Sequence, residues 1–156
     1  MGSVLDLSQL LSELQPFRGQ GQRLVFTNGC FDILHVGHVR YLKEAKALGD
    51  LLVVGMNSDS SVERLKGPTR PIQAEQDRAE ILSSLACVDY VCLFREDTPL
   101  ALIEALRPDI LVKGGDWPVE KIVGAPVVQS YGGQVRSLRF HPGRSSSDLI
   151  QKLIQL

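Results

Sequence analysis

Short apolar runs alternate with amphipathic segments along most of this chain, and this alternation limits the folds that it can adopt. Residues 50–56 read DLLVVGM, a nearly unbroken apolar run of the kind that is buried on both faces of a parallel sheet. Residues 36–48 place apolar side chains at every third position, which is typical of one helix face. Strands separated by helices predict a parallel sheet with right-handed crossovers and helices on both faces.

The same patterns predict the individual elements of a single-domain, Rossmann-like, doubly wound α/β fold. The predicted strands are 23–27, 50–56, 90–94 and 109–112, with one or two more in 126–129 and 135–138. The predicted helices are 36–48, 75–85, 99–106 and 145–156, and Thr98 is expected to cap the third, with Pro99 at its first position.

A short helix that carries Leu7, Leu10, Leu11 and Leu14 is expected near the N-terminus, ending at Pro16. Its apolar face suits packing on the side of the domain as well as a contact between two copies of the chain. We therefore divide the chain into an N-terminal helical extension, residues 1–20, and one α/β domain, residues 21–156.

The composition narrows the range of functions. A chain of 156 residues with 44% hydrophobic and 22% charged residues is ordinary for one globular domain. Its formal net charge of -1 gives no reason to expect nucleic acid or a membrane as partner. The chain start lacks the layout of a secretory signal, and three cysteines show no metal-ligand spacing. We expect a cytoplasmic protein, with a homo-oligomer (dimer or tetramer) left open.

Polar, glycine-rich segments follow four of the predicted strands. These segments are 28–38 (NGCFDILHVGH), 57–59 (NSD), 113–117 (KGGDW) and 141–147 (HPGRSSS). Ligands of open α/β sheets bind beyond the carboxyl ends of the strands, where these segments converge. The sequence therefore predicts a binding site at this edge of the sheet.

Two histidines stand out within the first of these segments. His35 and His38 are three residues apart at the start of a predicted helix, so both rings lie on the same side of its first turn. Gly37 removes a side chain between them, and a helix N-terminus favours anions. Two histidines close in sequence are often structural, but two ring donors at this position are suited to stabilising charge when a phosphoanhydride breaks.

Other nucleotide-binding and catalytic motifs are absent. The sequence contains no GxxxxGK[ST] and no full GxGxxG after the first strand, which argues against a P-loop ATPase and a dinucleotide oxidoreductase. HExxH and CxxC are also absent, and no dense carboxylate cluster suggests a protein metal site.

Residues 29–32 (GCFD) and 35–38 (HVGH) resemble the signature of the cytidylyltransferase-like nucleotidyltransferases, which share HxGH with class I aminoacyl-tRNA synthetases. Residues 65–72 (LKGPTRPI), 96–99 (EDTP) and 113–117 are similar to the corresponding segments of heptose 1-phosphate adenylyltransferases, a resemblance that covers about residues 24–153. This resemblance implies that ATP and a sugar 1-phosphate react to give an ADP-sugar and pyrophosphate, with Mg²⁺ held mainly by the ATP phosphates. Glycerol-3-phosphate cytidylyltransferase activity and a non-catalytic nucleotide-binding module are the alternatives.

The resemblance also implies a set of site residues. The expected catalytic residues are His35, His38, Lys66 and Arg78. The expected nucleotide-binding residues are Thr27, Asn28, Gly29, Cys30, Phe31, Gly37, Lys113, Gly114, Gly115, Asp116, Gly143, Ser145, Ser146 and Ser147. The expected substrate-binding residues are Asp32, Asn57, Asp59, Arg70 and Trp117, and no residue is expected to ligate a metal.

Simpler interpretations accompany several of these residues. An isolated Lys or Arg is often only solvated, and Asp32 and Asp116 are equally suited to capping a helix or a turn. The family usually carries Gly-x-Ser-Thr-Thr where this chain has 143–147 (GRSSS). Serine keeps the hydroxyl donor of threonine and is also a common helix N-cap, and no role is assigned to Arg144.

Overall fold

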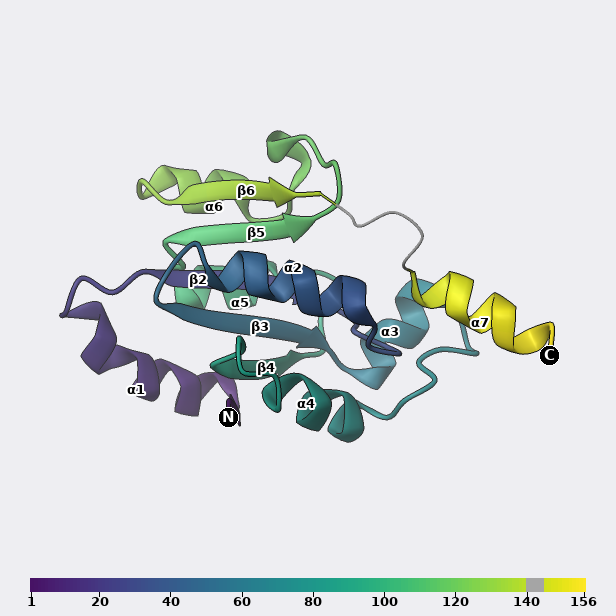
Figure 1. The fold of residues 1–156 in the computed structure, drawn as a ribbon. Coiled ribbons are helices and arrows are strands. Elements are labelled where there is room, and N and C mark those ends of the chain that lie inside the picture. Colours follow the sequence, from purple (N-terminus) through teal and green to yellow (C-terminus); the bar gives the residue numbers. More distant parts are fainter. Residues whose placement is uncertain (140–144) are drawn as a thin grey trace.

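The computed structural model describes residues 1–139 and 145–156, and it confirms the predicted α/β class. The described residues form one six-stranded sheet in the order β1-β4-β3-β2-β5-β6, in which every neighbouring pair is parallel (Figure 1). The strands are β1 (Ser3–Val4), β2 (Leu24–Gly29), β3 (Leu51–Asn57), β4 (Tyr90–Phe94), β5 (Ile110–Gly114) and β6 (Gln134–Leu138).

Helices cover both faces of this sheet, as a doubly wound fold requires. The helices are α1 (Leu7–Arg18), α2 (Val36–Lys46), α3 (Asp59–Lys66), α4 (Glu75–Ser83), α5 (Leu100–Leu106), α6 (Ala125–Ser130) and α7 (Ser146–Ile154), with a 3₁₀ turn at Val119–Lys121. One core cluster contains side chains of α1, α5 and α6, and the other contains side chains of α2 and α4. No helix among the described residues is long and apolar enough to cross a lipid bilayer.

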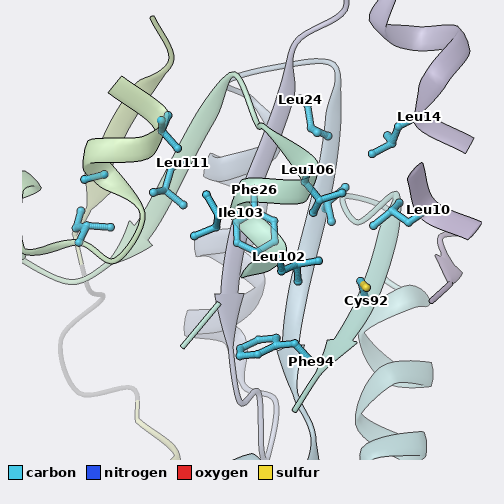
Figure 2. Packing of buried hydrophobic residues seen from close by; sticks show 14 residues of the cluster. Leu10, Leu14, Leu24, Phe26, Cys92, Phe94, Leu102, Ile103, Leu106 and Leu111 are labelled. Carbon is cyan, nitrogen blue, oxygen red and sulfur yellow. The ribbon is translucent and has the colours of Figure 1, made fainter. Parts of the chain in front are cut away.

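Strand β2 is fixed from both sides by these two clusters. Val25 and Phe26 are adjacent in β2 and fully buried, and they belong to opposite clusters because successive strand side chains alternate. Figure 2 shows Phe26 among Leu102, Ile103 and Leu106 of α5. Burial of each such side chain contributes about 1.5–3 kcal/mol, so the carboxyl end of β2 has a rigid base.

The N-terminal segment packs into the first of these clusters. Leu10 and Leu14 of α1 are almost completely buried there, and β1 pairs with β4 at the edge of the sheet. The prediction that the helix ends at Pro16 is wrong, because α1 continues to Arg18. The guanidinium of Arg18 donates to the carbonyl of Leu106, which holds this last turn against α5.

Two predicted elements take a different form in the structure. Residues 126–129, predicted as a strand, lie in helix α6, which begins after Gly124 with Pro126 in its first turn. A run of four apolar residues does not distinguish a strand from a buried helix, which explains the error. Helix α3 was not predicted because most of its residues are polar and Val62 is its one buried aliphatic side chain.

The predicted cap of the helix after β4 is also wrong. Helix α5 begins at Leu100, and Pro99 occupies the N-cap position without any side-chain hydrogen bond to the helix. Thr98 therefore does not cap it. Proline suits the entry because its missing N–H coincides with one of the unpaired amides of a helix start.

The strand order reverses next to β2. The chain passes from β2 to β3 and β4 on one side, and β5 and β6 follow on the other side. In open α/β sheets the crevice at such a reversal is the usual ligand site. The segments after β2 and β5 therefore meet where a ligand is expected.

Candidate active site

The loop between β2 and α2, residues 30–35, has an unusual backbone. Phe31 and Ile33 adopt positive φ angles of 49° and 57°. This left-handed region is unfavourable for non-glycine residues, and most of all for a β-branched one. Such conformations persist where neighbouring groups hold them, and they are common at functional sites. We call residues 30–35 the β2–α2 loop.

The two histidines cap helix α2 together. The ring Nδ1 of His35 accepts a hydrogen bond from the amide of Gly37 at 3.1 Å. The ring Nδ1 of His38 accepts one from the amide of His35 at 3.3 Å. The ring centroids are 3.9 Å apart. A neutral imidazole has one acceptor and one donor nitrogen, so both rings carry their proton on Nε2.

His38 is neutral at physiological pH. Burial, with smaller contributions from the nearby His35 and Lys66, lowers its pKa from 6.5 to about 4. The ring is therefore a hydrogen-bond donor through Nε2 without being a cation. Lys66 is the exposed last residue of α3, and its positive charge contributes to the lowered pKa of His38.

Phe31 supports His38 from the side of the strand. The Phe31 ring meets the His38 ring edge-on, with centroids 5.4 Å apart. A Cβ atom added to Gly29 would lie 2.9 Å from the Phe31 ring. Glycine at position 29 therefore gives Phe31 the space to lie against His38. These contacts give Gly29 and Phe31 a structural part in the site that the sequence did not indicate.

Tyr41 was missed by the sequence analysis, although it lies one helical turn after His38. Its hydroxyl is hydrogen-bonded to the hydroxyl of Thr27 at the end of β2. Its ring lies beside Gly114 of β5, where an added Cβ would be 3.3 Å away. Thr27 is fully buried, so its side chain serves this contact and is not exposed to a ligand. Tyr41 thereby ties α2 to both strands of the crevice.

The segment after β5 forms the other wall. Burial lowers the pKa of Lys113, and the neighbouring Cys30 partly opposes that effect, which places Lys113 beside the β2–α2 loop. Gly115 has a φ of 109° and donates its amide to Leu138. Asp116 and Trp117 are exposed, with 49% of Trp117 accessible. Gly115 itself is buried, so Asp116 and Trp117 are the accessible side chains of this wall.

Ser137 of β6 holds this segment in place. Its hydroxyl accepts from the amide of Trp117 at 3.2 Å and donates to the carbonyl of Gly115. This role could not be predicted from the sequence, because a serine within a strand is usually only a tolerated polar residue.

Asp32 faces the protein. Its buried carboxylate accepts from Nε of Arg70 at 2.7 Å and from the amides of Ile72 and Gln73 at 2.8 and 3.0 Å. Burial alone would raise the pKa of Asp32, but the amides of Gln73 and Ile72 and the Arg70 guanidinium together bring it below its usual value. In this placement both oxygens are engaged by the chain.

Arg78 is likewise placed differently from our expectation. Its side chain is fully buried, and its three nitrogens donate to the protein. The acceptors are the carbonyls of Gln73, Cys30 and Asn57 and the carboxylate of Asp59, at 2.6–3.0 Å. The structure therefore places Arg78 beneath the loop, among backbone oxygens.

Asn57 and Asp59 mark the end of β3. Asn57 is buried and donates from Nδ2 to the hydroxyl of Ser61 at 3.0 Å. Asp59 pairs with Arg78, while 41% of its side chain remains exposed. Of these two expected substrate-binding residues, Asp59 is the one whose side chain reaches the surface.

The start of α7 lies against the β2–α2 loop. Ser145 caps the helix by accepting from the amide of Asp148 at 3.0 Å. The hydroxyl of Ser146 donates to the carbonyls of Asp32 and Ile33 at 2.8 and 3.2 Å. Ser147 is exposed. The capping and the approach to the loop thus coexist at one helix end, whereas Gly143 and Arg144 lie outside the described residues.

Two of the side chains that could ligate Mg²⁺ in this part of the structure are carboxylates already engaged by other residues. Among residues 1–139 and 145–156, no three His, Cys, Asp or Glu side chains gather as a metal site would require. Asp32 is fully engaged, and Asp59 already pairs with Arg78.

Comparison with known proteins identifies the family. The family model described as cytidylyltransferase-like matches residues 26–152. "Bifunctional protein HldE" of Syntrophotalea carbinolica is 57% identical over 141 residues, which are 90% of this chain and 29% of that protein. HldE of Geobacter sulfurreducens is 53% identical over 152 residues, 97% of this chain and 31% of that protein. The chain thus spans about a third of the length of these relatives.

A solved structure gives the same result. The lipopolysaccharide core biosynthesis protein of Thermoplasma volcanium is 36% identical, with a TM-score of 0.62 over 78% of this chain and 98% of that one. The histidine pair at the start of α2 and the glycine-rich turn after β5 agree with the match over residues 26–152. This chain belongs to the cytidylyltransferase-like family of nucleotidyltransferases.

Proposed function

We propose that this domain transfers the adenylyl group of ATP to D-glycero-β-D-manno-heptose 1-phosphate and releases ADP-heptose and pyrophosphate. The observation that carries the proposal is the pair of Nε2 donors of His35 and His38 at the reversal of the strand order. The similarity to HldE and to a lipopolysaccharide core biosynthesis protein supports the choice of substrates.

The reaction is a single in-line displacement. A phosphate oxygen of the sugar 1-phosphate attacks the α-phosphorus of ATP, a new P–O bond forms, and the bond to the pyrophosphate oxygen breaks. The nucleophile is already an anion, so the step needs no general base. Catalysis then consists of positioning and of stabilising the charge that develops on the α-phosphate and the leaving group.

The histidine pair donates to the triphosphate through Nε2. Both Nδ1 atoms accept hydrogen bonds from backbone amides. The rings are therefore held, before the substrate arrives, in the tautomer that carries its proton on Nε2. A low pKa of about 4 for His38 means that no proton must be lost or gained during the step. The two rings act as fixed hydrogen-bond donors.

Positive charge for the phosphates comes from groups around the histidine pair. Lys66, exposed at the end of α3 and near enough to influence the pKa of His38, neutralises the triphosphate as a point charge. Mg²⁺ bound to the phosphates would lower the negative charge of the leaving pyrophosphate. The N-terminus of α7, with Ser146 and Ser147, supplies donors for the terminal phosphates.

The wall after β5 suits the nucleoside. The exposed Trp117, next to the turn at Gly115, offers a flat ring against which a base can pack. Asp116 is exposed next to this turn and suits the hydroxyls of ribose or sugar. Asp59 at the neighbouring strand end is suited to the same task.

The experiment is a pyrophosphate-release screen of the purified protein with ATP or CTP against a panel of phosphorylated acceptors. The proposal predicts release with ATP and the heptose 1-phosphate well above that with any other pair. Release with CTP and glycerol 3-phosphate would instead show a cytidylyltransferase of that type. Nucleotide binding without release for any pair would show a non-catalytic binding module.

A further inference from the structure

Four separate segments meet at the buried guanidinium of Arg78. Its Nη1 donates to the carbonyl of Cys30 in the β2–α2 loop at 2.6 Å and to that of Asn57 at the end of β3 at 2.9 Å. Its Nη2 donates to Asp59 at the start of α3 at 2.6 Å, and its Nε donates to Gln73 before α4 at 3.0 Å. One planar fork therefore connects the ends of two strands with the starts of two helices.

Gln73 extends this connection to the strained part of the loop. Its side-chain Oε1 accepts from the amide of Ile33 at 3.1 Å, and its own amide donates to Asp32 at 3.0 Å. The β2–α2 loop is therefore held at Cys30 by Arg78 and at Asp32 and Ile33 by Gln73.

The held residues surround the left-handed ones. Phe31 and Ile33 adopt positive φ, and His35 begins the helix two residues after Ile33. A loop with two such residues relaxes unless its neighbours oppose the relaxation. If it relaxed, Phe31 would leave the edge of the His38 ring and the paired caps at His35 and His38 would shift.

The burial of Arg78 excludes a simple contact with substrate. Its side chain has no exposed surface, and four donor–acceptor pairs already use most of its five N–H groups. A buried cation is costly unless it is paired and hydrogen-bonded, and its pairing here is with the protein. The group is built to organise the loop.

We propose that Arg78 is a positioning residue that, together with Gln73, holds the β2–α2 loop in the strained conformation in which His35 and His38 present their Nε2 donors to the phosphates. It acts through the loop and does not touch the nucleotide. The inference rests on the proposed adenylyl transfer for its effect on turnover, but the effect on the loop is independent of any activity.

The first test compares Arg78→Lys with Arg78→Gln. If Arg78 only supplied charge to a phosphate, lysine would keep much of the activity. A positioning role predicts that Arg78→Lys loses kcat on the order of a hundredfold, as when reacting groups are misplaced by about 1 Å, while KM for ATP changes little. Added guanidinium ion is expected to restore part of the turnover of Arg78→Gln but not that of a His38 variant.

The second test uses a milder change with a matched control, because a buried cation is a risk to folding. Gln73→Ala removes the bond to Ile33 and leaves the backbone bonds of residue 73 in place. Gln76→Ala changes the same residue type at an exposed position of α4. Gln73→Ala is expected to lower kcat about tenfold and Gln76→Ala to leave it unchanged.

Hydrogen exchange gives the readout that does not depend on turnover. The amide of Ile33 donates to Gln73 and that of His35 donates to His38, so both amides are expected to exchange faster in Gln73→Ala and Arg78→Gln than in Gln76→Ala. Unchanged exchange together with a large rise in KM for ATP would overturn the proposal in favour of direct contact. A wild-type protein without transferase activity would contradict the proposed function, while the exchange result would still decide whether Arg78 and Gln73 hold the loop.

Discussion

The amide of His35 donates to Nδ1 of His38, so one histidine of the pair fixes the ring of the other. A second hydrogen bond, from the amide of Gly37 to Nδ1 of His35, fixes the ring of His35. The spacing of three lets the amide of His35 reach the ring of His38 across the first turn of the helix. The two hydrogen bonds also set the chemical form in which both rings meet a substrate.

The His38 ring accepts a hydrogen bond at Nδ1 and is proposed to donate one from Nε2, and substitutions can separate these two functions. Asparagine keeps an acceptor near the position of Nδ1 and removes the Nε2 donor, so His38→Asn is expected to fold normally. Its turnover should fall about a hundredfold, corresponding to about 3 kcal/mol of transition-state stabilisation. Glutamine reaches the Nε2 position and is the matched control, expected to retain more activity. Circular dichroism and pyrophosphate release measure the two effects, and full turnover in His38→Asn would refute the donor role.

The low pKa of His38 has consequences for pH dependence. Its folded pKa of about 4 lies below the ordinary value of 6.5, so the unfolded chain binds more protons between these limits. The contribution of this residue to stability is therefore complete above pH 6.5 and declines as the pH falls toward 4. NMR titration of the ring should show a midpoint near 4. A midpoint near 6.5 would contradict the buried, neutral state.

Lys66 is predicted to act through charge alone. The residue is exposed, so Lys66→Ala should change the free energy of unfolding by less than about 0.5 kcal/mol. The pKa of His38 should rise, because Lys66 is one of the charges that lower it. Turnover should decrease with it. If the pKa of His38 stays the same in the variant, Lys66 is not directed toward the pair.

Gly29 tests the support of His38 by Phe31. A Cβ atom at position 29 would lie 2.9 Å from the Phe31 ring, so Gly29→Ala should displace that ring and with it His38. We expect kcat to fall by on the order of tenfold, since small misplacements of reacting groups are costly. Gly19→Ala is the control, because nothing lies within 4 Å of its added Cβ. Equal kinetics for the two variants would exclude this contact as a support.

The Tyr41–Thr27 pair provides a test of stability. Tyr41→Phe leaves the buried Thr27 hydroxyl without this partner and should cost about 1–3 kcal/mol in the free energy of unfolding. The double variant Tyr41→Phe/Thr27→Val removes both polar groups and should regain part of that loss. Urea unfolding measures both. A double variant as unstable as the sum of the single ones would mean that the two hydroxyls do not interact.

The sequence was sufficient for the α/β architecture, and it indicated the edge of the sheet at which the site is proposed. Buried strands and amphipathic helices carry their own periodicity, and the carboxyl ends of parallel strands necessarily meet at one edge. His35 and His38 could be chosen because their spacing and the glycine between them have a local meaning at a helix start. These features depend on neighbours in the chain.

The direction in which the charged side chains point could not be predicted from the sequence. Asp32 and Arg78 are of residue types that often bind substrates. Their hydrogen-bond partners, however, include Gln73 and Cys30, which lie far away in the chain. The same holds for Ser137, whose partners lie on the segment after β5. Long-range contacts of this kind decide whether a polar residue faces a ligand or supports another residue.

The most direct test of the central claim is a crystal structure of the protein with an ATP analogue whose bridging oxygen between the α- and β-phosphates is replaced by carbon. The account predicts that Nε2 of His35 and of His38 lie within hydrogen-bonding distance of the phosphates, about 2.7–3.2 Å, with the base beside the turn at Gly114 and Gly115. A nucleotide bound elsewhere, or at this edge with both rings turned away from the phosphates, would contradict it.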